Sequence, residues 1–319
     1  QRWEITGFLV CLGDTFFQAL EGPAAVVDRL YYERIRLDDR HTDVLCLKTE
    51  TDVSERLFPG WHMKAFNLNE QVESLPFAFR QMLTALLESH HTIAHYTQPS
   101  VLQMLERGIN PETVRPRREC VTVFYSDMIG FSRFAEHLAP DDLIELVNSH
   151  AEVCSQSVTR QHGQVNKLTG DGVLAYFVGL TSDDAIDAAV EVLEEMARRR
   201  ATAREGSPHQ HLYGGVGLAH GLVYEGNVGS SLKQDFTILG NTVNLAARLE
   251  SLTRDLDVRL NLDQSVVLGA KRSHPFISLG KHLLKGQSKE LELFSLESLS
   301  PLRVKEVYRD IEAFVTRGA

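Results

Sequence analysis

Two mainly apolar runs, FLVCL and FFQAL, lie on either side of Gly13 and Asp14, and this pattern predicts a strand hairpin in the stretch ITGFLVCLGDTFFQALEG. A helical pattern, PAAVVDRLYYERIRLDD, follows it, and then a second extended run, TDVLCLKTET. A hairpin, a helix and a further strand in this order indicate a small α+β domain, which we place at residues 1–72.

The apolar spacing then changes to steps of three and four residues from about Leu75 to Gly108. This period predicts two connector helices, interrupted at Gln98 and Pro99, of which the second ends on a glycine. The two prolines of INPETVRPRREC predict a linker, so we assign residues 73–117 to connector helices and linker.

Strands and helices alternate from Cys120 to about Leu296, and we place a second domain at residues 118–297. Its strand VTVFYSD precedes one long helical stretch (residues 132–161), the hairpin QVNKLTGDGVLAYF and a further helix that ends in ARRRATAR, interpreted as a solvated helix end. Later come the strand YGGVGLAHGLVYEGNVG and the helix NTVNLAARLESLT. This order predicts an antiparallel or mixed sheet covered by helices, followed by an amphipathic helix at residues 298–319.

Composition narrows the class of protein. The net charge of −10 argues against a nucleic-acid-binding surface, which needs clustered Lys and Arg. No apolar run approaches the roughly 20 residues that span a bilayer, so we expect no membrane segment and a cytoplasmic location. The four cysteines are too far apart for a zinc site or a disulfide scaffold, so we expect them to be reduced.

Two aspartates occupy positions where ligands collect. Asp127 ends an apolar strand, and Asp171 lies between two glycines at the turn of the hairpin. If hairpin and strand are neighbours, the two carboxylates repel each other unless a cation joins them, as a pair of Mg²⁺ ions would. Each residue alone is also explained structurally, Asp127 as a helix cap and Asp171 as a turn residue.

Further polar residues stand at suggestive positions. Asn244 and Arg248 are four residues apart and share a helix face, where an amide and a guanidinium could hold a polyphosphate. Lys285 beside Gly286 is a possible phosphate contact, although a solvated lysine explains it equally well. Lys167 is unusual, because a hairpin strand needs no lysine before its turn.

The motifs FYSDMIGFS, NKLTGDGVLAYF, GLAHGLVYEGNVG, FTILGNTVNLAARLE and LLKG, in this order, resemble the catalytic domain of class III nucleotide cyclases. The resemblance implies that Asp127, Asp171 and the backbone carbonyl of Met128 bind two Mg²⁺ or Mn²⁺ ions. One ion would lower the pKa of the ribose 3′-hydroxyl, and the other would hold the β- and γ-phosphates while the hydroxyl attacks the α-phosphorus. It further implies the remaining site residues: Asn244 positions the ribose, Arg248 stabilises the transition state and Lys285 holds the triphosphate.

The same resemblance implies that Lys167 and Thr237 choose the base. A lysine can donate to N1 of adenine, and the Thr237 hydroxyl can accept from the 6-amino group. Guanylyl cyclases of this family have an acidic residue and a cysteine at these positions, so ATP is the expected substrate.

The first segment resembles the later two-thirds of a BLUF domain, a blue-light sensor of ferredoxin-like fold that binds FAD. The resemblance rests on ITGFLVCLGDTFFQALEG, DDRHTDV and FPGWHMKAFNLN. It implies that Gln18 is the glutamine that rearranges beside the flavin, that Trp61 and Met63 respond to this change, and that Arg40 contacts the flavin. The family's first strand and helix have no counterpart before Gln1, so we expect a domain that is incomplete at its N-terminus.

Together these resemblances predict a photoactivated adenylyl cyclase. The expected assembly is a homodimer in which Asp127 and Asp171 of one chain meet Arg248 and the other substrate-binding residues of its partner. A guanylyl cyclase and a non-catalytic nucleotide-binding module are the two alternatives.

Overall fold

A computed structural model gives the fold. It describes residues 5–12, 15–38, 40, 44, 46, 49–50, 53, 55–56, 64–67, 93, 96–179, 181–230, 232–285, 289–299 and 301–318. The chain divides into two compact units, residues 1–97 with 101–111, and residues 98–100 with 112–319. Among the residues so described, no helix has the length and apolar character needed to cross a membrane.

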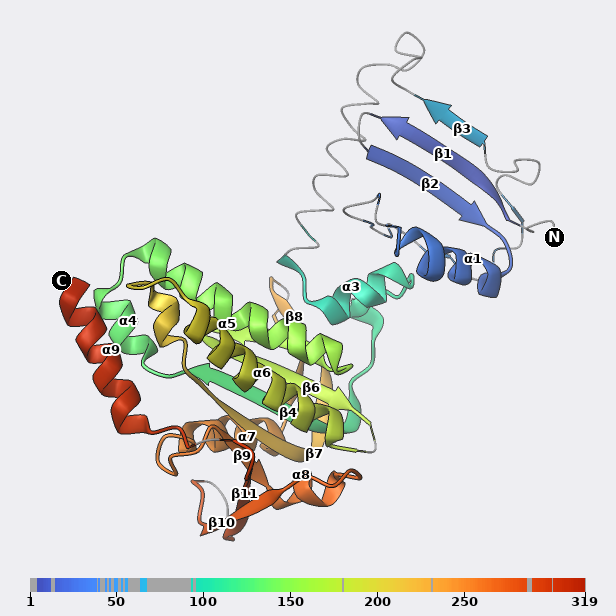
Figure 1. The fold of residues 1–319 in the computed structure, drawn as a ribbon. Coiled ribbons are helices and arrows are strands. Elements are labelled where there is room, and N and C mark those ends of the chain that lie inside the picture. Colours follow the sequence, from blue (N-terminus) through green and yellow to red (C-terminus); the bar gives the residue numbers. More distant parts are fainter. Residues whose placement is uncertain are drawn as a thin grey trace. The chain divides into compact units, whose positions relative to one another are not determined.

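The first unit contains a three-stranded sheet of order β2-β1-β3 (Figure 1). Strands β1 (Thr6–Leu12) and β2 (Thr15–Glu21) form the predicted antiparallel hairpin. Helix α1 (Ala24–Leu30) follows and continues into a π-helical turn, η1 (Tyr31–Ile35), which confirms the predicted helix.

The third strand of this sheet is not the one that the sequence predicted. The described residues of TDVLCLKTET, at positions 44, 46, 49 and 50, lie outside any strand. Strand β3 (Lys64–Asn67) instead pairs in parallel with β1, on the edge that β2 leaves open. A parallel partner requires a long crossover, which places it farther along the chain than the alternation suggested.

Helix α3 (Pro99–Glu106) is the predicted second connector helix. It begins at a proline. Proline favours the first helical position because an N–H group there would have no acceptor within the helix, so its absence costs nothing. Gly108 follows with φ +72°, a left-handed conformation suited to glycine. A short 3₁₀ turn, η2 (Pro111–Thr113), comes next. Most of the first connector helix lies outside the described residues.

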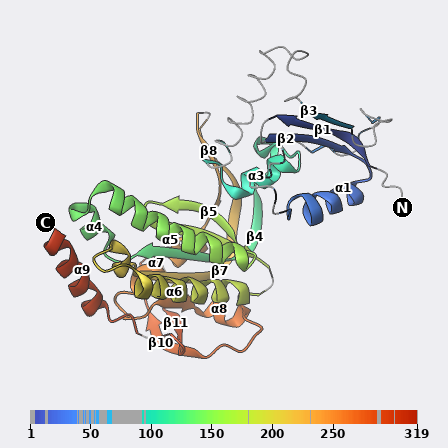
Figure 2. The ribbon, with the colours of Figure 1, turned by 45° about the horizontal axis from the view of Figure 1, so that its top comes forward.

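The second unit is built on a sheet with helices packed around it (Figure 2). The sheet is mixed and has eight strands, and among its described pairings only that of β7 with β9 is parallel. The strand order is β10-β11-β9-β7-β4-β6-β5, and β8 pairs with β7. The strands are β4 (Arg117–Met128), β5 (Gln164–Thr169), β6 (Gly172–Val178), β7 (Gly214–Gly229), β8 (Gln234–Leu239), β9 (Leu260–Asp263), β10 (Phe276–His282) and β11 (Leu291–Leu296). This arrangement confirms the predicted fold class.

Helices cover both faces of this sheet. They are α4 (Phe131–His137), α5 (Pro140–Arg160), α6 (Asp183–Thr202), the 3₁₀ helix η3 (Pro208–His211), α7 (Asn241–Leu252), α8 (Gln264–Gly269) and α9 (Val304–Gly318). Helices α5 and α6 lie side by side on one face (Figure 1). The hydrophobic core between these helices and the sheet includes Phe124 and α9 residues such as Ile311. Helix α7 packs on the other face, against Val123 and Leu174. Successive side chains of a strand therefore enter different cores.

The single long helix expected at residues 132–161 is two helices, because the helical structure is interrupted between α4, which ends at His137, and α5, which begins at Pro140. Pro140 occupies the start of α5, where it is tolerated, whereas inside a continuous helix it would remove a hydrogen bond and clash with the preceding turn. The predicted C-terminal helix is confirmed as α9.

Gly217 of β7 allows α7 to approach the sheet. A Cβ atom there would lie 2.2 Å from the Ala246 carbonyl oxygen and 2.3 Å from the Glu250 amide nitrogen. We expect Gly217→Ala to lower the free energy of unfolding by about 3 kcal/mol, because backbone atoms of α7 would have to shift. Thermal denaturation measures the loss. Gly179→Ala is the matched control, since open space surrounds its Cβ and the change should stay within about 0.5 kcal/mol.

Candidate active site

Asp127 and Asp171 come together at one end of the sheet. Asp127 is the penultimate residue of β4, and Asp171 lies in the turn between β5 and β6, the strand that pairs with β4. The two carboxyl groups are close enough for Asp127 to raise the pKa of Asp171. Gly172 leaves room for this arrangement, because a Cβ atom there would lie 3.3 Å from Asp127 Oδ1 and 2.9 Å from Thr169 Oγ1.

The environment of Asp171 disfavours its charged form. Burial raises the pKa of its carboxyl group, the neighbouring Asp127 raises it further, and the pKa reaches about 7. Two carboxyl groups held this close cannot both ionise cheaply near neutral pH without a compensating cation. Oxygen donors of this kind suit Mg²⁺ or Mn²⁺. Asp127 and Asp171 therefore fit a divalent-metal site.

Glu250 and Arg254, which the sequence analysis did not single out, complete this group. Arg254 lies 3.6 Å from Asp127 (Nη2 to Oδ2) and donates to Glu250 Oε2 at 3.2 Å. Glu250 is only 2% exposed, and burial raises the pKa of its carboxyl group to about 7. In the sequence, the only indication that Glu250 and Arg254 interact was their spacing of four residues, which runs from the last turn of α7 into the residues that follow it.

A buried histidine supports the strand beneath Asp127. His150 of α5 is fully buried, and its Nε2 lies 3.0 Å from the hydroxyl of Ser126. Burial lowers the pKa of His150 to about 4, so the ring is neutral at pH 7. It therefore adds no positive charge to the pair of carboxyl groups.

Asn244 and Arg248 face away from the carboxyl groups of their own chain. Arg248 precedes Glu250 by two residues, which is about 200° around a helix, and Asn244 shares the side of Arg248. Asn244 is exposed and Arg248 is half-buried. Within the described part of the chain, the buried Nη1 atom of Arg248 has no hydrogen-bond partner.

A β-bulge determines where Lys167 points. Val165 pairs with Ala175 and Lys167 with Leu174, so Asn166 is an extra residue in β5. In regular pairing Lys167 would oppose Val173, which belongs to the core under α5 and α6. The bulge shifts Lys167 by one position and so to the sheet face that carries α7.

Thr237 of β8 lies beside this bulge. Its hydroxyl donates to Asn166 Oδ1 at 2.7 Å, and Asn166 Nδ2 donates to the backbone carbonyl of Phe236 at 3.3 Å. The structure therefore brings Thr237 next to the residue that precedes Lys167. The sequence analysis did not single out Asn166, because a polar residue in a strand carries no signal of its partner on another strand.

The other predicted residues lie apart from these contacts. Met128 ends β4 with its side chain in the core, so that only its backbone is available near Asp127. Lys285 is exposed in the segment that follows β10. In the first unit, Gln18 is an exposed residue of β2, and Arg40 binds Asp38 through Nε at 2.8 Å. Trp61 and Met63 lie outside the described residues.

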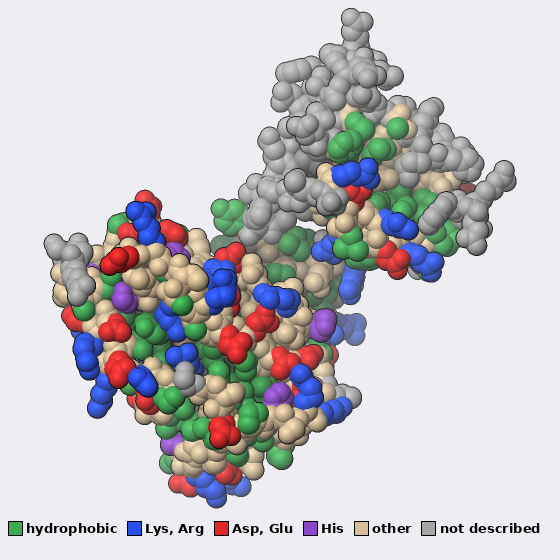
Figure 3. All heavy atoms as spheres, in the orientation of Figure 1, with side chains coloured by type: hydrophobic (Ala, Val, Ile, Leu, Met, Phe, Trp, Pro, Cys, Tyr) green, Lys and Arg blue, Asp and Glu red, His purple; other side chains and the backbone are tan. Residues whose placement is uncertain are grey.

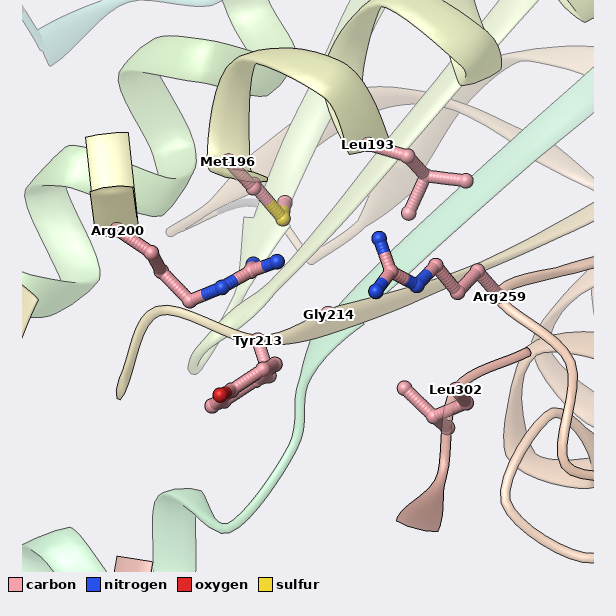
Figure 4. Close-up of a pocket in the computed structure, with 7 residues that line it drawn as sticks. All are labelled: Leu193, Met196, Arg200, Tyr213, Gly214, Arg259 and Leu302. Atoms are coloured by element: carbon pink, nitrogen blue, oxygen red, sulfur yellow. The ribbon is translucent and has the colours of Figure 1, made fainter. Parts of the chain in front are cut away.

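A pocket lies among α6, the start of β7, the residue that precedes β9 and the segment that precedes α9 (Figure 4). Arg200 and Arg259 both extend into it beside Tyr213. Arg200 donates to the Leu212 carbonyl at 2.7 Å and stacks over the Tyr213 ring. The arginine run at the end of α6 is therefore not wholly solvated.

Over the face of the unit that carries α5 and α6, acidic and basic side chains are interspersed (Figure 3).

Comparison with known families assigns both parts of the chain. The family model described as "Adenylate and Guanylate cyclase catalytic domain" matches residues 113–298. The chain belongs to this family. A second model, BLUF, described as "Sensors of blue-light using FAD", matches residues 1–64.

The chain is similar over nearly its whole length to a bacterial light-regulated adenylyl cyclase of known structure. The two share 37% identity with a TM-score of 0.90, covering 98% of this chain and 91% of the other. Photoactivated adenylate cyclase subunit alpha of Euglena gracilis is 27% identical over 92% of this chain. The chain spans only 29% of that relative's length. The adenylyl cyclase CyaB of P. aeruginosa matches 59% of this chain and 98% of its own, with 25% identity and a TM-score of 0.51.

Proposed function

We propose that this protein is a blue-light-regulated adenylyl cyclase that converts ATP to 3′,5′-cyclic AMP and pyrophosphate. The observation that carries the proposal is the Asp127–Asp171 pair, held at a strand end in a domain of the cyclase family. A nucleotide-binding module without catalytic activity would have no need of two mutually repelling carboxyl groups, which cost stability when no cation is bound.

Asp127 and Asp171, with the backbone carbonyl of Met128, would hold the divalent ions. Bound there, Mg²⁺ or Mn²⁺ would make the ribose 3′-hydroxyl more acidic and neutralise phosphate charge. Glu250 and Arg254 would have a positioning role, because Arg254 lies 3.6 Å from Asp127 and donates to Glu250. Arg248 would stabilise the charge on the reacting phosphate, Asn244 would orient the ribose and Lys285 would contact the triphosphate.

Two chains are needed to complete such a site. Arg248 points away from Asp127 of its own chain, and its buried Nη1 lacks a partner among the described residues. The β7–β8 region also exposes large apolar side chains of the kind that mark protein interfaces. They are Leu222, Tyr224, Val228, Leu232 and Leu239. We therefore propose a homodimer with an active site on each side of its axis.

The first unit would bind FAD and respond to blue light. Gln18 is exposed on β2, where its amide can act as both donor and acceptor towards a flavin, and Arg40 would contact the cofactor. An absorption spectrum of the purified protein tests this role. A flavin band that shifts slightly to the red on illumination supports it, whereas a protein loaded with FAD that shows no such shift contradicts it.

The catalytic proposal is tested by measuring cyclic nucleotides from purified protein supplied with Mg²⁺ or Mn²⁺. We expect cyclic AMP from ATP, because Lys167 and Thr237 suit adenine. Faster turnover of GTP would favour a guanylyl cyclase. If neither nucleotide is turned over, the enzymatic proposal fails and a non-catalytic binding module remains.

Metal binding should depend on pH through Asp171. Its folded pKa of about 7 lies above that of an unfolded aspartate, so without metal its contribution to stability is lost as pH rises from about 4 to 7. A bound cation requires the ionised form, so protons compete with it below pH 7. We expect Mn²⁺ to raise the melting temperature more at pH 8.5 than at pH 5.5. Asp171→Asn should abolish this difference, and an equal shift at both pH values would contradict the site.

A further inference from the structure

We propose that Asn166 is a specificity-determining residue, which fixes the Thr237 hydroxyl as a hydrogen-bond acceptor and thereby selects a 6-amino purine over a 6-oxo purine. Asn166 acts through Thr237 and does not itself touch the base. The inference rests on the proposed adenylyl cyclase function and assigns a role to a residue outside its expected substrate-binding set.

The orientation of the Asn166 amide is determined by its neighbours. A backbone carbonyl can only accept hydrogen bonds, so the group that faces the Phe236 carbonyl at 3.3 Å must be the Asn166 NH₂. The amide oxygen therefore faces Thr237. If the amide were flipped, two acceptors would face each other at Phe236.

The polarity of Thr237 follows from that orientation. Its hydroxyl has one proton, and this proton is donated to Asn166 Oδ1 at 2.7 Å. Asn166 and Thr237 are each only 2% exposed, so bulk water does not compete for the proton. The oxygen of Thr237 retains lone pairs and can only accept. It therefore suits the 6-amino group of adenine and repels the 6-oxo group of guanine or hypoxanthine.

The β-bulge accounts both for the direction of Lys167 and, through Asn166, for the polarity of Thr237. Asn166 is the extra residue of β5, so its side chain reaches β8 while Lys167 turns towards the face of α7. Lysine alone would distinguish the purines only at N1. With Thr237 held as an acceptor, positions 1 and 6 of the ring are both read, each by a group of fixed polarity.

The experiment compares kcat/KM for ATP, ITP and purine riboside triphosphate, which carry an amino group, an oxo group and hydrogen at position 6. In Asn166→Ala the Thr237 hydroxyl can rotate and donate to an oxo group. We expect the ATP to ITP ratio to fall about tenfold, as suits the loss of one polar discrimination. The ratio of ATP to purine riboside triphosphate should change little, because the freed Thr237 hydroxyl can still accept from the 6-amino group. Asn166→Leu, which fills the volume without accepting a hydrogen bond, should behave in the same way if the alanine variant folds poorly.

Two controls separate this role from a merely structural one. Asn166→Asp keeps an acceptor for Thr237, and in this buried site the protonated carboxyl group can still donate to the Phe236 carbonyl, so the variant should retain the wild-type ATP to ITP ratio. In a Thr237→Val background, Asn166→Ala should leave that ratio unchanged, because the hydroxyl through which it acts is gone. An unchanged ratio in Asn166→Ala and Asn166→Leu, or the same fall in both backgrounds, overturns the inference while the proposed function stands. Absence of cyclic AMP from the wild type overturns both.

Discussion

Two inactive variants, Asp171→Asn and Arg248→Ala, should together recover about a quarter of wild-type cyclase activity when coexpressed, because random pairing makes half of the dimers mixed. Each mixed dimer has one site with both substitutions and one site with neither. Separately, Asp171→Asn removes a metal ligand, and Arg248→Ala should lower kcat by a factor on the order of 10² to 10³. The measurement is cyclic AMP formed per milligram of protein.

The matched control combines two substitutions from the same side of the site. Asp127→Asn and Asp171→Asn affect carboxyl groups that one chain supplies together, so every site of their mixed dimers lacks one ligand. Coexpression of these two variants should recover nothing. If Asp171→Asn and Arg248→Ala form mixed dimers without recovering activity, each chain must build its active site alone, and the proposed dimeric site is wrong.

Asp171→Asn by itself should have opposite effects on activity and on stability. Activity should fall by at least about 10³, because the amide cannot replace a carboxylate that binds the divalent ions. The metal-free protein should be as stable as the wild type or more stable at pH 8. There the wild-type carboxyl group is ionised although burial and Asp127 disfavour its charge, whereas asparagine carries no charge to bury.

Two measurements on the same preparation check this prediction. One is turnover with metal present, and the other is thermal unfolding in EDTA, which removes the metal. Gly179→Ala is a suitable reference, since open space surrounds its Cβ and it lies outside the proposed site. A variant that loses activity together with several degrees of melting temperature would show that Asp171 is needed for folding. A variant that keeps its activity would remove Asp171 from the metal site.

The sequence was sufficient where the signal is local. Apolar periodicity gave the hairpin of the first unit and most helices of the second unit, because each face must be buried at the period of its own element. Motif order predicted the cyclase family, which the match over residues 113–298 shows. Asp127 and Asp171 could be suspected as neighbours from a strand end and a hairpin turn alone.

Contacts between distant segments were decided only by the tertiary structure. The bulge at Asn166 cannot be read from β5, because it is defined by pairing with β6, and without it Lys167 would face the opposite core. The polarity of Thr237 depends on an amide 71 positions away in the chain. Glu250 became part of the site through the packing of α7 against β7. Periodicity states which side of an element is buried, whereas register and packing determine which side chains meet there.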